Sequence, residues 1–166
     1  MDHNMFCFQC EQTAGCTGCT SRGVCGKDAQ TAQVQDRLTG ALIGLARAAD
    51  TSPDAGPETW QLMIEGLFAT LTNVNFDPDS LNALAGRVRA EKQRLVPDCA
   101  VCTAPCGRTG DYDLAQLWGA QEDIRSLKSL LLFGSRGMAA YAYHAMVLGY
   151  RDESVERFLS KALFAV

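Results

Sequence analysis

Eight cysteines in two groups constrain the fold of this 166-residue chain more than any other feature. Five of them lie within the first 25 residues and three follow later: Cys7, Cys10, Cys16, Cys19 and Cys25, then Cys99, Cys102 and Cys106. Cysteines that lie close together in the sequence can bind one metal ion or cluster, whereas disulfide frameworks usually distribute cysteines along a chain. We therefore predict metal binding rather than a set of disulfide bonds.

Composition and charge exclude several classes of protein. The net charge is -4, 47% of the residues are hydrophobic and 20% are charged, and no cluster of Lys and Arg is present. A nucleic-acid surface needs a basic stripe, so we expect no nucleic-acid partner. The first residues lack the basic region of a secretory signal, and no apolar stretch approaches the ~20 residues of a membrane span. We therefore expect a cytoplasmic protein without a membrane partner.

Helical periodicity dominates the sequence after an N-terminal loop. Residues 1–28 are rich in Cys, Gly and Thr and show no hydrophobic period, whereas apolar residues recur at steps of three and four through 29–166. This pattern predicts an all-α fold, a one-domain helical bundle with a cysteine-rich cluster-binding loop at its N-terminus. The predicted helices cover residues 28–49, 58–72, 80–95, 114–148 with a possible break at 134–137, and 153–166.

The apolar positions predict which face of each helix is buried. Asp28 is the expected cap of the first helix, and Gly149 is the expected stop of the long one. The predicted core positions of the first and third helices are Val34, Leu38, Leu42, Leu45 and Ala49, then Leu81, Leu84, Ala85 and Val88. In the long helix, the predicted inward face consists of Ile124, Leu127, Leu131, Met138, Tyr141 and Ala145. The apolar last helix runs to the final residue, which suggests a longer parent protein or a partner surface.

The spacing of the first cysteine group leaves three interpretations open. An iron-sulfur cluster needs four thiolates on one compact loop, with glycines that let backbone amides reach the sulfurs. Structural zinc also takes four thiolates, but usually from two Cys-x-x-Cys pairs that lie further apart than Cys10 and Cys16 do here. Free or redox-active thiols are the third interpretation. Iron and sulfide are favoured, and spacing alone leaves Cys16 as a competing ligand.

The same loop resembles the N-terminus of the hybrid-cluster proteins, also called prismane proteins or hydroxylamine reductases. The resemblance rests on Met5-Phe6-Cys7, on Gln9-Cys10-Glu11-Gln12-Thr13-Ala14 and on Gly23-Val24-Cys25-Gly26-Lys27. It continues through residues 67–73, 122–128 and 137–149, and so extends over essentially the whole chain.

The resemblance implies a ligand set and a role. By similarity to the family, a 4Fe-4S cluster would be bound by Cys7, Cys10, Cys19 and Cys25, and Cys16 would lie outside that set. The complete family proteins reduce hydroxylamine to ammonia, or nitric oxide, at a second cluster whose ligands come from later domains. Because this chain ends before those ligands, we expect only the N-terminal electron-transfer domain and assign no catalytic residue. The implied partners are a redox protein that donates electrons and the hybrid-cluster domains.

An alternative from another class is a non-enzymatic module that binds zinc for stability or serves as an interaction surface.

For the loop itself, we expect Phe6 and Phe8 to shield a cluster from water, and Lys27 and Arg22 to offset its negative charge.

The remaining candidate residues receive structural interpretations. The second cysteine group, Cys99, Cys102 and Cys106, lacks a local fourth ligand. A second metal site completed by Cys16 is one interpretation, but we expect reduced thiols in a tight loop or residues that face a further domain. We also expect Arg108 to pair with Asp111, His144 to have a packing role and His3 to have none.

Overall fold

The computed structural model describes residues 5–10, 17–97 and 110–166. Within these ranges the chain forms six helices: α1 (Ala29–Thr51), α2 (Pro57–Ala69), α3 (Pro78–Leu95), α4 (Leu114–Trp118), α5 (Glu122–Val147) and α6 (Glu153–Ala165). The described residues contain no strand, only one isolated β-bridge between Cys7 and Cys19. The predicted all-α fold is confirmed.

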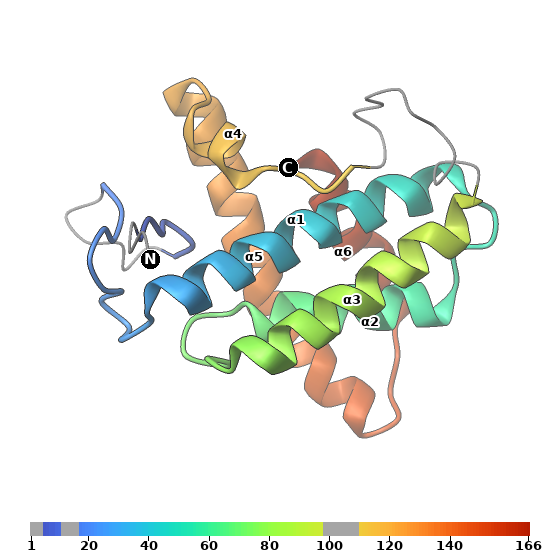
Figure 1. Cartoon of the computed structure of the whole chain (residues 1–166). Coiled ribbons are helices and arrows are strands. Elements are labelled where there is room, and N and C mark those ends of the chain that lie inside the picture. Colours follow the sequence, from blue (N-terminus) through green and yellow to red (C-terminus); the bar gives the residue numbers. More distant parts are fainter. Residues whose placement is uncertain (1–4, 11–16, 98–109) are drawn as a thin grey trace.

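Helix α1 is the centre of the bundle. It packs against α2, α3 and α6, while α5 packs mainly against α2 and α6. Figure 1 shows α5 running across the direction of α1, with the cysteine loop beside the N-terminal end of α1. Because neighbours cover it on several sides, α1 is buried over most of its circumference, and its buried residues include the polar Thr31, Gln35 and Thr39. All five predicted core positions of α1 and all four of α3 are buried.

The predicted ends of the helices hold where a cap or a glycine defines them. The Asp28 carboxylate accepts a hydrogen bond from the Thr31 amide at 2.7 Å, which confirms Asp28 as the cap of α1. Gly149 follows α5 with a φ of +85°, a left-handed conformation that glycine adopts without a steric penalty. Its position confirms the predicted stop.

The predicted single helix over residues 114–148 is wrong in its interior. The structure has two helices there, and the break lies at Gly119, which caps the C-terminal end of α4. Asp113 caps the start of α4 through a 2.9 Å hydrogen bond from the Ala115 amide. In contrast, α5 continues through Gly134 and Gly137, the predicted break. A glycine inside a helix costs only about 1 kcal/mol, which packing of the helix offsets.

The predicted inward face of α5 is also wrong. Ile124, Leu127, Met138 and Tyr141 are exposed, and Leu131 and Ala145 are half-buried. The face that meets the core consists instead of Leu132, Ser135, Arg136 and Ala139. These positions also follow helical spacing, so the sequence contains two candidate stripes, and the more apolar one is the exposed one. Because two residues of the buried stripe, Ser135 and Arg136, are polar, hydrophobic periodicity alone does not identify it.

No helix in the described part of the chain is both long and apolar enough to cross a membrane.

Candidate metal centre

Cys7 and Cys19 are held side by side by the backbone. The Cys7 amide donates to the Cys19 carbonyl at 3.0 Å, and the Cys19 amide donates back at 2.8 Å. Both residues are buried and pack with Met5 and Ala32 in a small apolar cluster against the start of α1. This bridge brings together two predicted ligands from different parts of the loop.

The other two predicted ligands, Cys10 and Cys25, are half-buried, and all four thiols are free of disulfide bonds. Among the described residues, no three Cys, His, Asp or Glu side chains lie close enough together to hold a metal ion. Gly18 precedes Cys19 with a φ of +113°, and an added Cβ there would lie 2.4 Å from the Phe6 ring. The close approach of this ring requires glycine at residue 18.

A lysine side chain lies against the first of these thiols. Lys27 is buried, and its ammonium nitrogen lies 3.8 Å from the sulfur of Cys7. Burial raises the pKa of Cys7, while the nearby Lys27 charge acts in the opposite direction. A metal or cluster binds the thiolate, so binding to Cys7 would release a proton. Arg22 is exposed and donates to the Gly26 carbonyl at 3.2 Å, which braces the end of the loop.

Three aromatic rings border the loop on the side of α4. Phe6 and Phe8 both contact Trp118, with ring centroids 5.0 and 4.8 Å apart. Phe8 is buried in the main core, whereas Phe6 is 38% exposed. The rings therefore anchor the loop to α4, and Phe8 excludes water better than Phe6 does.

A buried polar network joins the loop to three helices. Arg136 on α5 donates through Nη1 to the Gln9 carbonyl at 2.7 Å and through Nη2 to Gln9 Oε1 at 3.3 Å. The same guanidinium donates to Thr39 Oγ1 on α1 at 2.9 Å and to Thr70 Oγ1 at the end of α2 at 3.1 Å. The side-chain amide of Gln9 in turn donates through Nε2 to the Asp36 carboxylate. Gln9, between Cys7 and Cys10, is therefore fixed by both a cation and an anion.

Burial shifts the pKa of both charged members of this network. It raises the pKa of Asp36 to about 6, against the opposing effects of its Gln9 hydrogen bond and the Arg136 and Lys27 charges. It lowers the pKa of Arg136 to about 10, and Asp36, Cys7 and Cys10 oppose that shift. Arg136 therefore stays protonated at neutral pH, and the centre contains a permanent buried cation.

Several predicted residues lie outside the described ones: Cys16, Cys99, Cys102, Cys106, Arg108 and His3. Asp111, the expected partner of Arg108, forms ion pairs with Arg89 at 2.7 Å and Lys92 at 2.5 Å, and its pairing with Arg108 stays a prediction. His144 packs edge-on against the Phe68 ring, with centroids 5.4 Å apart, which agrees with the predicted packing role.

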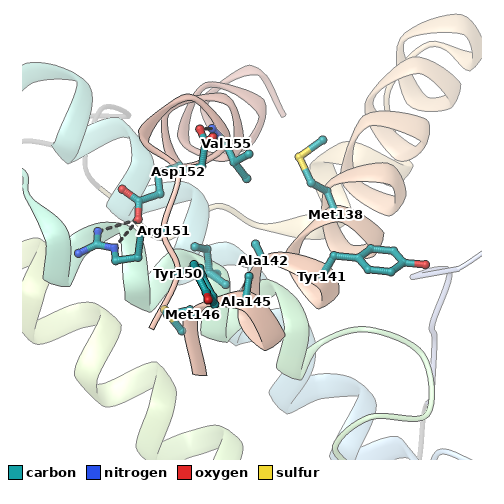
Figure 2. A pocket seen from close by; sticks show the side chains of 11 residues that line it. Met138, Tyr141, Ala142, Ala145, Met146, Tyr150, Arg151, Asp152 and Val155 are labelled. Atoms are coloured by element: carbon teal, nitrogen blue, oxygen red, sulfur yellow. Dashed lines mark hydrogen bonds and ion pairs between the residues drawn. The ribbon is translucent and has the colours of Figure 1, made fainter. Parts of the chain in front are cut away.

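A hollow lies away from the cysteine loop, between the C-terminal half of α5 and the start of α6. Its volume is about 440 Å³, and its walls are mostly apolar, with Met138, Ala142 and Val155 among them. Arg151 at its edge pairs with the largely buried Glu156 at 2.6 Å. Figure 2 shows Tyr141 projecting away from Arg151, and Tyr141 is 82% exposed. Of the charged residues that line the hollow, Arg151 and Glu156 neutralise each other, and Asp152 caps the start of α6.

The donor set of the loop fits an iron-sulfur cluster. Four reduced thiols lie on one short loop, two of them paired by the backbone, and two buried cations lie beside them. Thiolate ligands give such a cluster a net negative charge, which the ammonium of Lys27 and the guanidinium of Arg136 would offset. These features define an all-α protein with a cysteine-rich, cation-lined loop.

Comparison with known proteins identifies the family. Residues 5–166 match the model of the Prismane/CO dehydrogenase family, and the chain belongs to that family. The resemblance seen in the sequence is thereby confirmed, and membership of the family supports an iron-sulfur protein in general.

Three of the curated relatives are named hydroxylamine reductase. A hydroxylamine reductase of Desulfitobacterium hafniense (strain Y51) is 40% identical over 98% of this chain and 33% of its own length. One from Methanococcus vannielii is 36% identical over the same shares, and one from Porphyromonas gingivalis is 38% identical over 100% and 34%. The chain spans about a third of the length of these relatives.

Two members of the site were missed in the sequence. Arg136 and Asp36 both lie on segments recognised as helical, but neither was considered as part of the site. A signal was present for Arg136, which is the only basic residue between Leu131 and Ala140 in an otherwise apolar or small stretch. A charge inside such a stretch is buried only when it is paired or hydrogen-bonded, so it indicates a polar partner across the interface.

Proposed function

We propose that this chain is an electron-transfer domain that binds a 4Fe-4S cluster through Cys7, Cys10, Cys19 and Cys25. The observation that carries the proposal is the backbone pairing of Cys7 with Cys19, together with the Lys27 ammonium 3.8 Å from the Cys7 sulfur. Pairing brings ligands from separate parts of the loop together, and the ammonium stabilises negative charge on the sulfur. A bound cluster of this kind supplies a site that accepts and releases single electrons.

The residues around the thiols have separate tasks in this proposal. Phe8 and Trp118 limit access of water from the α4 side, and Lys27 offsets thiolate charge. Gly18 lets the Phe6 ring lie against the loop. A redox protein would donate the electron, and the name of the relatives suggests that it is used in reduction of hydroxylamine by a complete family protein. Catalysis would then take place at groups other than the residues described for this chain.

Anaerobic purification tests the proposal. The expected product is a brown protein with about four irons and four acid-labile sulfides per chain, which bleaches reversibly when dithionite reduces it. A colourless protein that contains zinc would contradict the proposal and support the zinc-binding alternative. About two irons and two sulfides per chain would contradict the cluster type while retaining an iron-sulfur protein.

Matched cysteine variants test the ligand set. Cys19→Ser removes a proposed ligand and is expected to abolish most of the visible absorbance and iron content. Cys16→Ser removes a cysteine of the same loop that lies outside the proposed set, and is expected to retain both. Equal loss of iron in the two variants would contradict the assignment of ligands.

A further inference from the structure

Arg136 is a buried cation, and burial of a charged side chain requires compensating interactions. Only 1% of it is exposed, although its guanidinium is charged at neutral pH. Removing such a group from water costs several kcal/mol unless hydrogen bonds and opposite charge compensate. No carboxylate of the described residues lies within 4.0 Å of the guanidinium nitrogens, so no direct ion pair among these residues supplies that opposite charge.

Two of its acceptors are set in place by the helices themselves. Thr39 Oγ1 donates its proton to the Gln35 carbonyl, four residues earlier in α1, at 2.8 Å. Thr70 Oγ1 lies 3.1 Å from two carbonyls at the end of α2. A hydroxyl that donates to its own helix keeps lone pairs free to accept from Arg136. The core of the bundle therefore fixes the guanidinium independently of the loop.

The remaining donors of the guanidinium reach the cysteine loop. Both contacts are made to Gln9, one to its backbone carbonyl and one to its side chain, and Gln9 lies between Cys7 and Cys10. The side-chain amide of Gln9 also donates to the Asp36 carboxylate, so the residue cannot rotate without losing bonds on both sides. Arg136 thus transmits the rigid geometry of α1, α2 and α5 to the backbone between two predicted ligands.

We propose that Arg136 is a positioning residue for the iron-sulfur cluster, which fixes the Cys7 to Cys10 backbone and supplies a buried positive charge that favours the reduced cluster. The inference rests on the proposed function. Reduction adds one electron, delivered by the redox partner or by dithionite, and so adds one negative charge to the cluster. A fixed cation in a low-dielectric environment stabilises the more negative state and raises the reduction potential. The bond to the Gln9 carbonyl slows opening of the loop and loss of iron.

Three variants of the purified chain separate charge from geometry. Arg136→Met removes the charge and keeps an unbranched side chain, whereas Arg136→Lys keeps the charge and loses the planar donor fork. Lys128→Met is the matched control, because Lys128 is a cation on the same helix whose ammonium bonds the Val166 carbonyl at 2.5 Å and not the cysteine loop. The readouts are the reduction potential of the cluster and the rate at which a chelator removes iron.

The expected results differ among these variants. Arg136→Met is expected to shift the one-electron equilibrium at least tenfold toward the oxidised cluster, which corresponds to about 59 mV. Arg136→Lys is expected to shift it less but to lose iron several-fold faster than the unmodified chain. Lys128→Met is expected to change neither. Equal potentials for Arg136→Met and Lys128→Met would overturn the proposed role of the charge.

A milder variant keeps the inference testable if Arg136→Met fails to fold. Thr39→Val removes one acceptor and leaves the cation, so iron loss is expected to be at least threefold faster with the potential nearly unchanged. An unaltered rate of iron loss would overturn the positioning role. If the unmodified chain contains no iron and sulfide, the proposed function fails. If it contains the cluster and every variant behaves like it, only this inference fails.

Discussion

The two halves of α1 differ in what they bury. The first half, from Thr31 to Thr39, buries three polar side chains, whereas the second half, from Gly40 to Ala49, buries only glycine and apolar residues. The polar half faces the loop before α3, Arg136 and the cysteine loop: Gln35 donates to the Asn75 carbonyl at 2.8 Å, and Thr39 accepts from Arg136. We infer that the second half stabilises the bundle, while the first half positions the loop.

The largest expected effect comes from creating a cavity in the apolar second half of α1. Leu45 has no exposed surface, and Leu45→Ala would leave a cavity among α1 and its neighbours. A loss of about 2–5 kcal/mol in the free energy of unfolding is expected. Urea unfolding followed by circular dichroism measures it. A loss below about 1 kcal/mol would show that the second half of α1 does not carry the stability of the bundle.

A smaller effect is expected at the boundary between the halves. The segment after residue 110 crosses α1 at Gly40, where the Tyr112 amide donates to the Gly40 carbonyl at 3.0 Å. Gly40→Ala would place a Cβ 2.2 Å from the Tyr112 carbonyl oxygen, and the backbone must move. A destabilisation of about 1–3 kcal/mol is expected.

Gly86→Ala is the control for the crossing at Gly40, because Gly86 is exposed on α3 and no atom lies within 4 Å of the added Cβ. This change is expected to stabilise the protein by about 0.5–1 kcal/mol, since alanine favours the helix. Equal melting temperatures for the two variants would contradict the close packing at Gly40.

Asp36 lies in the polar first half of α1, and its titration is expected to make the free energy of unfolding depend on pH. Its pKa of about 6 in the folded chain lies above its ordinary value of 3.8. Between these values the folded state holds a proton that the unfolded state has released, so stability falls as the pH rises from about 4 to about 6. The shift corresponds to at most about 3 kcal/mol, and less is expected because Asp36 lines a pocket at the edge of the loop.

Asp36→Asn tests this dependence. The variant is expected to lose most of the decline in unfolding free energy between pH 4.5 and pH 6.5, because the amide does not titrate. The two chains are compared by urea unfolding at both pH values. An identical decline in both chains would assign the effect to another group.

The smallest effect is expected at a polar residue of the first half. Gln35 Oε1 is buried without a hydrogen-bond partner among the described residues, although its Nε2 is bonded. Gln35→Met loses one hydrogen bond but also removes the unsatisfied oxygen, so a change below about 1 kcal/mol is expected. Thermal unfolding measures it. A loss as large as that of Leu45→Ala would abolish the distinction between the halves of α1.

Much of the fold could be predicted because local signals agreed with the tertiary structure. Asp28 caps α1, Gly149 ends α5, and the predicted core positions of α1 and α3 recur at helical spacing, so periodicity located residues that are buried in both helices. In α5 two stripes were available, and the sequence alone favoured the more apolar one. Burial of the other stripe is possible because other segments supply hydrogen-bond acceptors to Arg136.

The candidate site, like the fold, could be predicted from the sequence only in part. The cysteine pattern and its resemblance to a family could be read directly, because ligand residues of one loop lie close together in the sequence. Their assignment as ligands stays a prediction, and residues 11–16, which include Cys16, lie outside the described part of the chain. The pairing of Cys7 with Cys19 and the contact of Lys27 with Cys7 depend on how the loop folds back, which spacing does not specify.

The sequence by itself determined the helical class, the capped start of the first helix and the position of the cysteine loop, since capping and periodicity act over a few residues. Only the tertiary structure decided that Arg136 lies under that loop, 127 residues from Gln9 in the sequence. A buried charge is stable only where several segments together supply its hydrogen bonds. Such a site therefore exists only in the folded chain.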